Sequence, residues 1–274
     1  MEPLETNGLG DETCGRLSLF AKDLSTGRTI EADADRVMGT ASCIKLFILI
    51  ELLRRVSAGD LALGDRIAVH ARQQVGGSGI LKALSAGLDM TLRDAAVLMM
   101  ALSDNTATNM LIDLLGLERI NRTATELGCA HTRLINRIDF KAIGGDITKL
   151  AVGTTRDFAL ALERIASGTL FYETASAAAL DILSCQLHVD LLPRYLSFNP
   201  YAKDLGASQD LWVANKTGFF PGFRGDVAIF TLPDRRIVAA AFLDDIEDLS
   251  FAPENPGARR LGEVGAALLA RLAG

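Results

Sequence analysis

The stretch Gly39-Thr40-Ala41-Ser42-Cys43-Ile44-Lys45 leads into an almost unbroken apolar run, residues 46–53. A segment that is apolar on nearly every side predicts a buried helix. Ser42 and Lys45 are three residues apart, so at a helix start they share one face, with Cβ atoms about 5–6 Å apart. A partly desolvated lysine can take the proton of a serine hydroxyl. The spacing makes Ser42 a candidate nucleophile and Lys45 its base, although S-x-x-K alone also occurs by chance.

Length and composition allow one large domain or two intertwined lobes. The chain has 274 residues, of which 49% are apolar, enough for a sizeable core. Its net charge of −6 includes no basic block, which argues against nucleic acid or an anionic membrane as a partner. Residues 1–6 lack the features of a secretion signal, and residues 46–53 are too short to span a bilayer. We therefore expect a cytoplasmic protein with no membrane partner.

The cysteines give no support for a metal or redox site. Cys14, Cys43, Cys129 and Cys185 form no C-x-x-C pair, and no paired histidine spacing accompanies them. We expect neither a metal nor a cofactor. Cys43 adjoins Ser42, but on a helix its side chain points about 100° away, so we discount it as the nucleophile.

Alternation and turn signals place strands at both ends of the chain. Residues 16–24 and 28–34 flank Ser25-Thr26-Gly27, which predicts an N-terminal hairpin. Residues 211–219, 226–232 and 237–243 are β-rich runs separated by turns, which predicts an antiparallel meander. An amphipathic helix over residues 256–272 closes the chain.

The middle of the chain has a helical pattern. Capping boxes at 91–94 and 154–157 begin two of its helices. Ser103-Asp104-Asn105 separates two apolar helices, and these three residues are consistent either with a capped helix junction or with a polar site. The glycine-rich segment 76–79 has no following G-K-[ST], so we interpret it as a flexible loop and not as a P-loop.

These patterns predict an α/β (α+β) fold in which strands from both ends form one antiparallel sheet flanked by helices, with a helical lobe inserted. We place the sheet-containing lobe at residues 1–45 and 195–274 and the helical lobe at 46–194. A cleft between two such lobes is a common ligand site.

Three short motifs coincide in order with these elements. Ser42-Cys43-Ile44-Lys45 lies at the helix start, Ser103-Asp104-Asn105 between helices, and Lys216-Thr217-Gly218 on the first strand of the meander. S-x-x-K, S-D-N and K-T-G together mark class A β-lactamases and penicillin-binding proteins. From about residue 14 to 272 the chain therefore resembles the class A β-lactamase-like serine hydrolases, which implies a small-molecule substrate.

The resemblance implies a role for each matching residue. Ser42 would attack an amide or ester carbonyl and become acylated, while Lys45 takes its proton directly or through water. Ser103, assisted by Lys216, would relay a proton to the leaving nitrogen.

The resemblance also implies substrate contacts. Asn105 would bind the side-chain amide of the substrate, and Lys216 and Thr217 of the K-T-G motif, which Gly218 completes, would bind its carboxylate. Backbone N–H groups of Ser42 and Phe219 would hold the oxyanion, each worth about 2.7–4 kcal/mol. Arg224 matches an arginine that contacts the carboxylate in many relatives, and is otherwise an ordinary strand arginine.

The chain departs from the class A pattern in the segment that releases the acyl group. Residues 132–141 contain no glutamate and no E-x-x-L-N motif. Asp139 lies near the expected place, but its side chain is one methylene shorter, and a displacement of about 1 Å can cost about 100-fold in rate. Asp139 is therefore either the water base or a loop-capping residue.

Three functions follow from this pattern. The first is a β-lactamase-like serine hydrolase that acts on a β-lactam or related amide. The second is a cytoplasmic esterase, peptidase or acyl-transferase for a small metabolite. The third is a penicillin-binding or sensing protein that is acylated but not turned over.

Overall fold

A five-stranded antiparallel sheet joins the two ends of the chain in the computed structural model, which describes residues 14–273. β1 (Arg16–Asp23) and β2 (Thr29–Ala32) form the N-terminal hairpin. β8 (Trp212–Phe220), β9 (Phe223–Thr231) and β10 (Arg236–Asp244) form the meander. The strand order is β2-β1-β10-β9-β8, and Leu19 lies opposite Ala241 where the two ends meet. The predicted fold class is confirmed.

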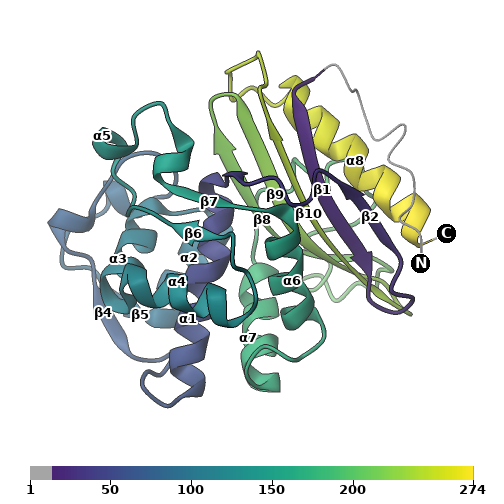
Figure 1. Cartoon of the computed structure of the whole chain (residues 1–274). Helices are drawn as coiled ribbons and strands as arrows, with labels where there is room; N and C mark the ends of the chain where they lie inside the picture. The colour runs from purple at the N-terminus through teal and green to yellow at the C-terminus, as the bar shows by residue number, and fades with distance from the viewer. Residues whose placement is uncertain (1–13, 274) are drawn as a thin grey trace.

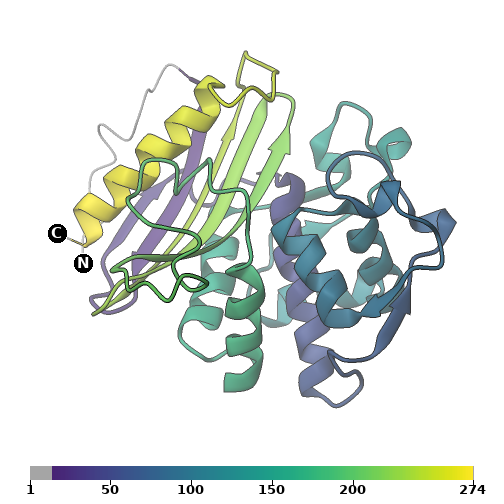
Figure 2. The same ribbon diagram turned by 180° about the vertical axis from the view of Figure 1, so that it is seen from behind.

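Helices cover both faces of this sheet (Figures 1 and 2). α8 (Pro256–Leu272) packs on one face, where Leu19 of β1 and Leu261 of the helix belong to one buried apolar cluster. α6 (Thr155–Ala166) packs on the other face against β1, β9 and β10. Side chains alternate along a strand, so β1 turns Leu19 toward α8 and the small polar Ser18 toward Thr155 of α6.

α1 (Lys45–Ser57) lies at the centre of the helical lobe, as its apolar sequence predicts. Every residue from Lys45 to Leu53 is buried, including Glu51. The Glu51 carboxylate is satisfied by Arg54 at 2.6 Å and by the Thr123 hydroxyl at 2.6 Å. The surrounding helices are α2 (Leu92–Ala101), α3 (Asn105–Leu115), α4 (Leu117–Glu126) and α7 (Glu173–Leu183).

Two small sheets complete the lobe. β3 (Met38–Gly39), β7 (Ala151–Gly153) and β6 (Arg133–Leu134) pair in the order β3-β7-β6. Because β3 leads into Ser42, this pairing brings the loop that carries the short helix α5 (Phe140–Ile143) to the side of the serine. The second sheet joins β4 (Arg66–Ala68) to β5 (Asp89–Thr91). Short 3-10 helices span Ala41–Ile44, Ala71–Gln73, Leu81–Ala83 and Ile147–Lys149.

One of the two predicted capping boxes is reciprocal. Thr91 and Asp94 cap α2 in both directions. At α6 the Thr154 hydroxyl accepts from the amide of Asp157, but the Asp157 carboxylate does not return to Thr154. It accepts instead from the His131 amide and the Thr132 hydroxyl, both at 2.9 Å. The second box is therefore corrected to a one-sided cap, because a tertiary contact takes the carboxylate.

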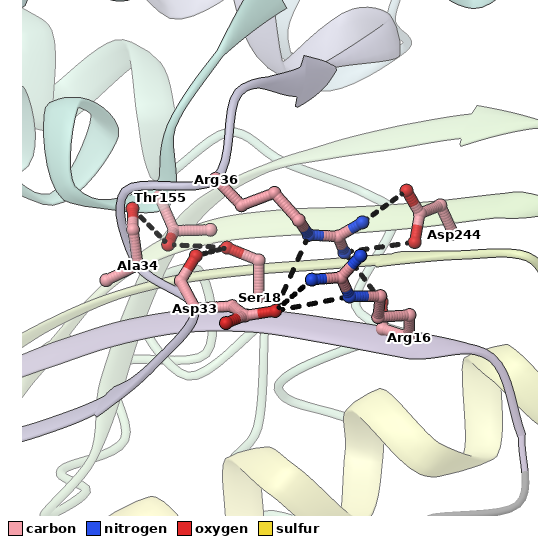
Figure 3. A network of polar contacts seen from close by, with 7 residues as sticks. All are labelled: Arg16, Ser18, Asp33, Ala34, Arg36, Thr155 and Asp244. Carbon is pink, nitrogen blue, oxygen red and sulfur yellow. Dashed lines mark hydrogen bonds and ion pairs between the residues drawn. The ribbon is translucent and has the colours of Figure 1, made fainter.

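The segment that leaves the sheet for the helical lobe is fixed by a polar network (Figure 3). Asp33, which adopts a left-handed φ of 46°, accepts from the Arg16 guanidinium at 2.8 Å. Arg36 donates to both oxygens of Asp244 at 2.8 and 3.0 Å, so it ties the segment to β10. The remaining members of the network are Ser18, Ala34 and Thr155.

No helix within residues 14–273 combines the length and hydropathy that a membrane crossing requires. The acidic segment 1–6 lies outside the described residues. The division into lobes at residues 45/46 and 194/195 stays a prediction.

Candidate active site

A cavity of about 640 Å³ lies between β8 and the helical lobe. Four predicted site residues line it, namely Ser42, Ser103, Asn105 and Phe219. They come from three separate stretches of sequence, so only the folded chain brings them together. The volume lies within the range of about 300–1,000 Å³ that is typical of small-molecule sites.

Ser42 lies in the 3-10 helix Ala41–Ile44, three residues before α1 begins at Lys45. In this tighter helix side chains at i and i+3 eclipse, which directs Ser42 and Lys45 to the same side. Ala41 has φ 44° and Ser103 has φ 52°, and both values belong to the left-handed region. Such conformations cost about 1–3 kcal/mol each in non-glycine residues and cluster at functional sites. Backbone strain therefore lies on both sides of the Ser–Lys pair.

Lys45 connects the first two motifs through its ammonium group. Its Nζ donates to the Ser103 carbonyl at 2.8 Å, to the Ser103 hydroxyl at 3.0 Å and to Asn105 Oδ1 at 2.9 Å. Burial lowers the pKa of Lys45 well below its usual value, and the positive charge of Lys216 lowers it further. A lysine that is readily deprotonated gains the lone pair that a general base needs.

Ser103-Asp104-Asn105 contributes both to the site and to a helix cap. Asp104 is the N-cap of α3 and accepts from the Ala107 amide at 2.9 Å. Its second oxygen accepts from the amides of Ile80 and Leu81. The two interpretations of the motif are thus compatible, because the middle residue caps while Ser103 and Asn105 face the cavity.

The glycine-rich loop packs directly against this motif. The side chain of Asn105 donates from Nδ2 to the Gly76 carbonyl at 3.0 Å, and its backbone N–H donates to the Ser78 carbonyl at 3.1 Å. A Cβ on Gly79 would lie 2.3 Å from the Asp104 carboxylate, and one on Gly77 would lie 2.6 Å from Asn105 Nδ2. Gly77 and Ser78 line the cavity, so this loop forms part of its wall.

The K-T-G motif runs along β8 beside the 3-10 helix of Ser42. A Cβ on Gly218 would lie 2.9 Å from the Thr40 carbonyl oxygen, so only glycine allows this approach. Lys216 is fully buried, donates from Nζ to the Thr217 carbonyl at 2.8 Å, and has its pKa lowered to about 8 by burial. The Thr217 hydroxyl is buried and has no hydrogen-bond partner within residues 14–273.

Cys43 points away from the cavity, as its helical position predicts. Its Sγ lies 3.6 Å from the Lys216 carbonyl oxygen, and the side chain is fully buried. Burial raises the pKa of the thiol, which disfavours the nucleophilic thiolate.

Arg224 lies on β9 opposite Phe219, the residue that follows the K-T-G motif. The residue is 1% exposed and is absent from the residues that line the cavity. It donates to the carbonyl oxygens of Phe220 at 3.0 Å and Phe223 at 2.7 Å, and also to that of Ser250. Its guanidinium lies over the ring of Phe219 at 5.4 Å. Backbone carbonyls thus hold the guanidinium, and the expected contact with a substrate carboxylate stays a prediction.

Asp139 also lies outside the cavity lining, while its neighbour Ile138 lies within it. Asp139 is exposed and caps α5, accepting from the amides of Lys141 and Ala142. Asn109 of α3 holds Ile138 in place, donating to its carbonyl at 3.0 Å and accepting from its amide at 2.9 Å. The residue that this loop presents to the cavity is apolar.

A sequence model of the β-lactamase enzyme family matches residues 5–272. The chain belongs to this family. A β-lactamase from Sphaerobacter thermophilus is 29% identical, with 98% of each chain covered and a TM-score of 0.87. PBP-A is 23% identical, with 98% of each chain covered and a TM-score of 0.78. A class A β-lactamase from Mycobacterium abscessus is 22% identical, with 95% of each chain covered and a TM-score of 0.79. At these lower identities PBP-A and the mycobacterial enzyme show the shared fold.

Membership makes this protein a β-lactamase-like hydrolase that acts on small molecules. The site of this family member also contains residues that sequence reasoning missed. His188 and Asp190 line the cavity beside Phe219, and Asn215 donates to the buried Asp226 at 3.0 Å behind Lys216. His188 and Asp190 lie in an irregular connection with no recognisable motif. Asn215 directly precedes K-T-G, and only the pairing of β8 with β9 reveals its partner.

Proposed function

We propose that Ser42 is the nucleophile and that it is acylated by a β-lactam or a related activated amide. The observation that carries the proposal is the convergence of Ser42, Ser103 and Asn105 on one cavity, with the Lys45 ammonium bonded to the last two. Lys45 donates to the Ser103 hydroxyl at 3.0 Å and lies three residues from Ser42, which supports its role as the proton carrier between the two hydroxyls.

Each proton in the acylation step has a carrier. Neutral Lys45 takes the Ser42 proton while Oγ forms a bond to the carbonyl carbon. Backbone amides of Ser42 and Phe219 stabilise the oxyanion. When the C–N bond breaks, the leaving nitrogen takes the Ser103 proton, and the Lys45 ammonium, 3.0 Å away, reprotonates Ser103. Lys45 ends the step neutral, as it began.

We also propose that release of the acyl group is slow. The loop wall of the cavity presents Ile138, Phe140, Ile143 and Leu150, none of which can take a proton from water. This observation favours a protein that is acylated faster than it is turned over. A mutant of PBP-A has been solved as an acyl-enzyme complex with penicillin-G, so the fold can hold such an adduct.

Intact-protein mass spectrometry with penicillin G tests both parts of the proposal. We expect a mass increase equal to one whole penicillin molecule, present within minutes and lost over hours. Ser42→Ala should abolish the adduct, and circular dichroism should show an unchanged fold. An adduct that survives on Cys43 would falsify the nucleophile assignment. Adduct loss within seconds would reject slow release and favour ordinary hydrolysis.

If no penicillin adduct forms, Ser42 would remain a candidate for ester or peptide substrates. A fluorophosphonate probe that labels the parent protein and not Ser42→Ala would then support an esterase, peptidase or acyl-transferase. The apolar loop wall suits a substrate with a large apolar acyl group.

A further inference from the structure

His188 lies alongside the K-T-G motif of β8. Its backbone carbonyl accepts from Nδ2 of Asn215, which directly precedes the motif, at 3.2 Å. Its ring packs edge-on against the ring of Phe219, which directly follows the motif, with the ring centroids 6.2 Å apart. Its backbone N–H donates to the Gln186 side chain at 3.0 Å. Contacts on both flanks of the motif thus hold His188 in the wall of the cavity that also contains Ser42.

The imidazole of His188 is free to bind a ligand. Both hydrogen bonds of this residue within residues 14–273 belong to its backbone, so neither ring nitrogen is engaged. The side chain is half-buried and lines the cavity, so a ligand can reach it. Neutral imidazole has one donor and one acceptor, whereas imidazolium has two donors and a positive charge. Among the described residues that line the cavity, His188 alone can become cationic near neutral pH.

The charges nearest to His188 favour an anionic ligand. Burial lowers the pKa of His188 below its ordinary value of 6.5, and the positive charges of Lys216 on β8 and Lys45 on α1 lower it further. Asp190, in the same connection as His188, opposes them, but Lys216 acts on the imidazole more strongly than Asp190 does. An environment that opposes a further positive charge attracts a negative one.

The charged groups of β9 lie behind the residues that contact His188. Asp226 accepts from Asn215 at 3.0 Å, and Arg224 lies over the ring of Phe219 at 5.4 Å. Burial raises the pKa of Asp226 to about 7, so this carboxylate also loses its charge as the pH falls. A variant of His188 is therefore needed to isolate the imidazole from the other titrating groups.

We propose that His188 binds a carboxylate of the substrate, and that its imidazolium form binds this group more tightly than its neutral form. The affinity for substrates that carry a carboxylate then rises as the pH falls, whereas uncharged analogues gain nothing from His188. The sign follows from linkage, because a bound carboxylate favours the imidazolium and binding therefore takes up a proton. The proposal rests on the proposed function for the substrate class, but it concerns binding, which precedes acyl transfer.

Binding to the Ser42→Ala protein tests this role without any acyl transfer. The probes are penicillin G, whose carboxylate stays ionised above about pH 5, and its methyl ester, which lacks that charge. Calorimetry gives the dissociation constants between about pH 5 and 8. We expect acidification to tighten the binding of penicillin G by at least about fivefold more in Ser42→Ala than in Ser42→Ala with His188→Gln, since glutamine keeps a donor but not the charge. For the methyl ester the two proteins should show the same pH dependence.

A matched control and a direct readout accompany this measurement. His131 is exposed and lies outside the cavity lining, so Ser42→Ala with His131→Gln should keep the pH dependence of Ser42→Ala. In NMR titrations, saturating penicillin G should move the titration of the His188 ring to higher pH by about 0.7 unit or more, which is the fivefold effect expressed as a pKa change. The methyl ester should not move it. A merely structural role of His188 predicts no such shift, and His188→Gln identifies the signal.

The outcomes separate this proposal from the acylation proposal. An equal pH dependence with and without His188, an unmoved titration of its ring, an equal effect with the methyl ester, or no binding of penicillin G at about pH 5 overturns the role of His188. A pH dependence that requires His188, together with no adduct on the parent protein, keeps this role and rejects acylation by penicillins. An adduct on the parent protein without any effect of His188 on binding rejects the role and keeps the acylation.

Discussion

The two walls of the cavity differ in polarity, because one carries polar side chains and the other carries apolar ones. One wall carries Ser42, Ser103 and Asn105, and the last two accept hydrogen bonds from the buried Lys45. Its backbone is strained at Ala41 and Ser103. The facing loop, residues 138–150, presents apolar side chains, and its Asp139 caps a helix outside the cavity lining. Under the proposed mechanism, the polar wall provides for proton transfer during acylation, whereas the loop presents no base to the cavity for the water that would end the reaction.

The largest expected effect concerns the polar wall. Lys45→Met keeps much of the side-chain volume and removes the base, so acylation by penicillin G should slow by about 10²–10⁴-fold. Stopped-flow or timed mass spectrometry measures the rate, and thermal unfolding shows whether the fold survives. Lys203→Met, at an exposed position, is the control. A rate within a few-fold of the parent would assign the proton transfer to another group.

The next effect concerns the apolar wall. Ile138→Glu places a carboxylate on a backbone that Asn109 already fixes, so release of the acyl group should accelerate by about 100-fold. Ile138→Gln has nearly the same shape and no base, and should leave release slow. The decay of the penicillin adduct measures both. If glutamine and glutamate accelerate release equally, access of water and not a missing base limits turnover.

A smaller effect is expected in the pH dependence of folding stability, through the buried Asp226 and Lys216. Burial raises the pKa of Asp226 from 3.8 to about 7, so the folded state keeps a proton that the unfolded state loses. Stability from this group therefore falls as pH rises from about 4 to about 7. Burial lowers the pKa of Lys216 from 10.5 to about 8, so stability rises again between these values.

Urea unfolding across pH 4–10 measures this dependence. Asp226→Asn should lose less stability than the parent between pH 4 and 7, by roughly 1–3 kcal/mol. Lys216→Met should remove the rise above pH 8. Parallel curves for Asp226→Asn and the parent in the acid range would contradict the raised pKa of Asp226.

The smallest effect is expected at Asp139. Asparagine also caps helices, so Asp139→Asn should change the release of the acyl group less than about twofold. Asp139→Ala should leave release unchanged as well, while it destabilises the fold by about 0.5–2 kcal/mol through loss of the cap. A tenfold or greater slowing in Asp139→Asn would restore Asp139 as the water base and end the contrast between the walls.

Much of the architecture could be predicted because its signals are local. The alternation in β1, the apolar run of α1 and the capping box of α2 each depend on residues within one element. The structure differs where a distant partner intervenes. Asp157 leaves the predicted capping box because residues 131 and 132 take its carboxylate.

The sequence by itself determined the order of the elements, the candidate nucleophile and the three motifs. Strands repeat every 2 residues and helices every 3.6, and Ser42 and Lys45 are three residues apart, so these signals follow from local geometry. Tertiary structure alone decided which side chains face the cavity. Of two successive loop residues, Ile138 lines the cavity and Asp139 does not. The hydrogen bonds from Asn109 to the backbone of Ile138 fix this orientation of the loop. The surroundings of Arg224 likewise include the distant Ser250 carbonyl, a contact that no local sequence pattern predicts.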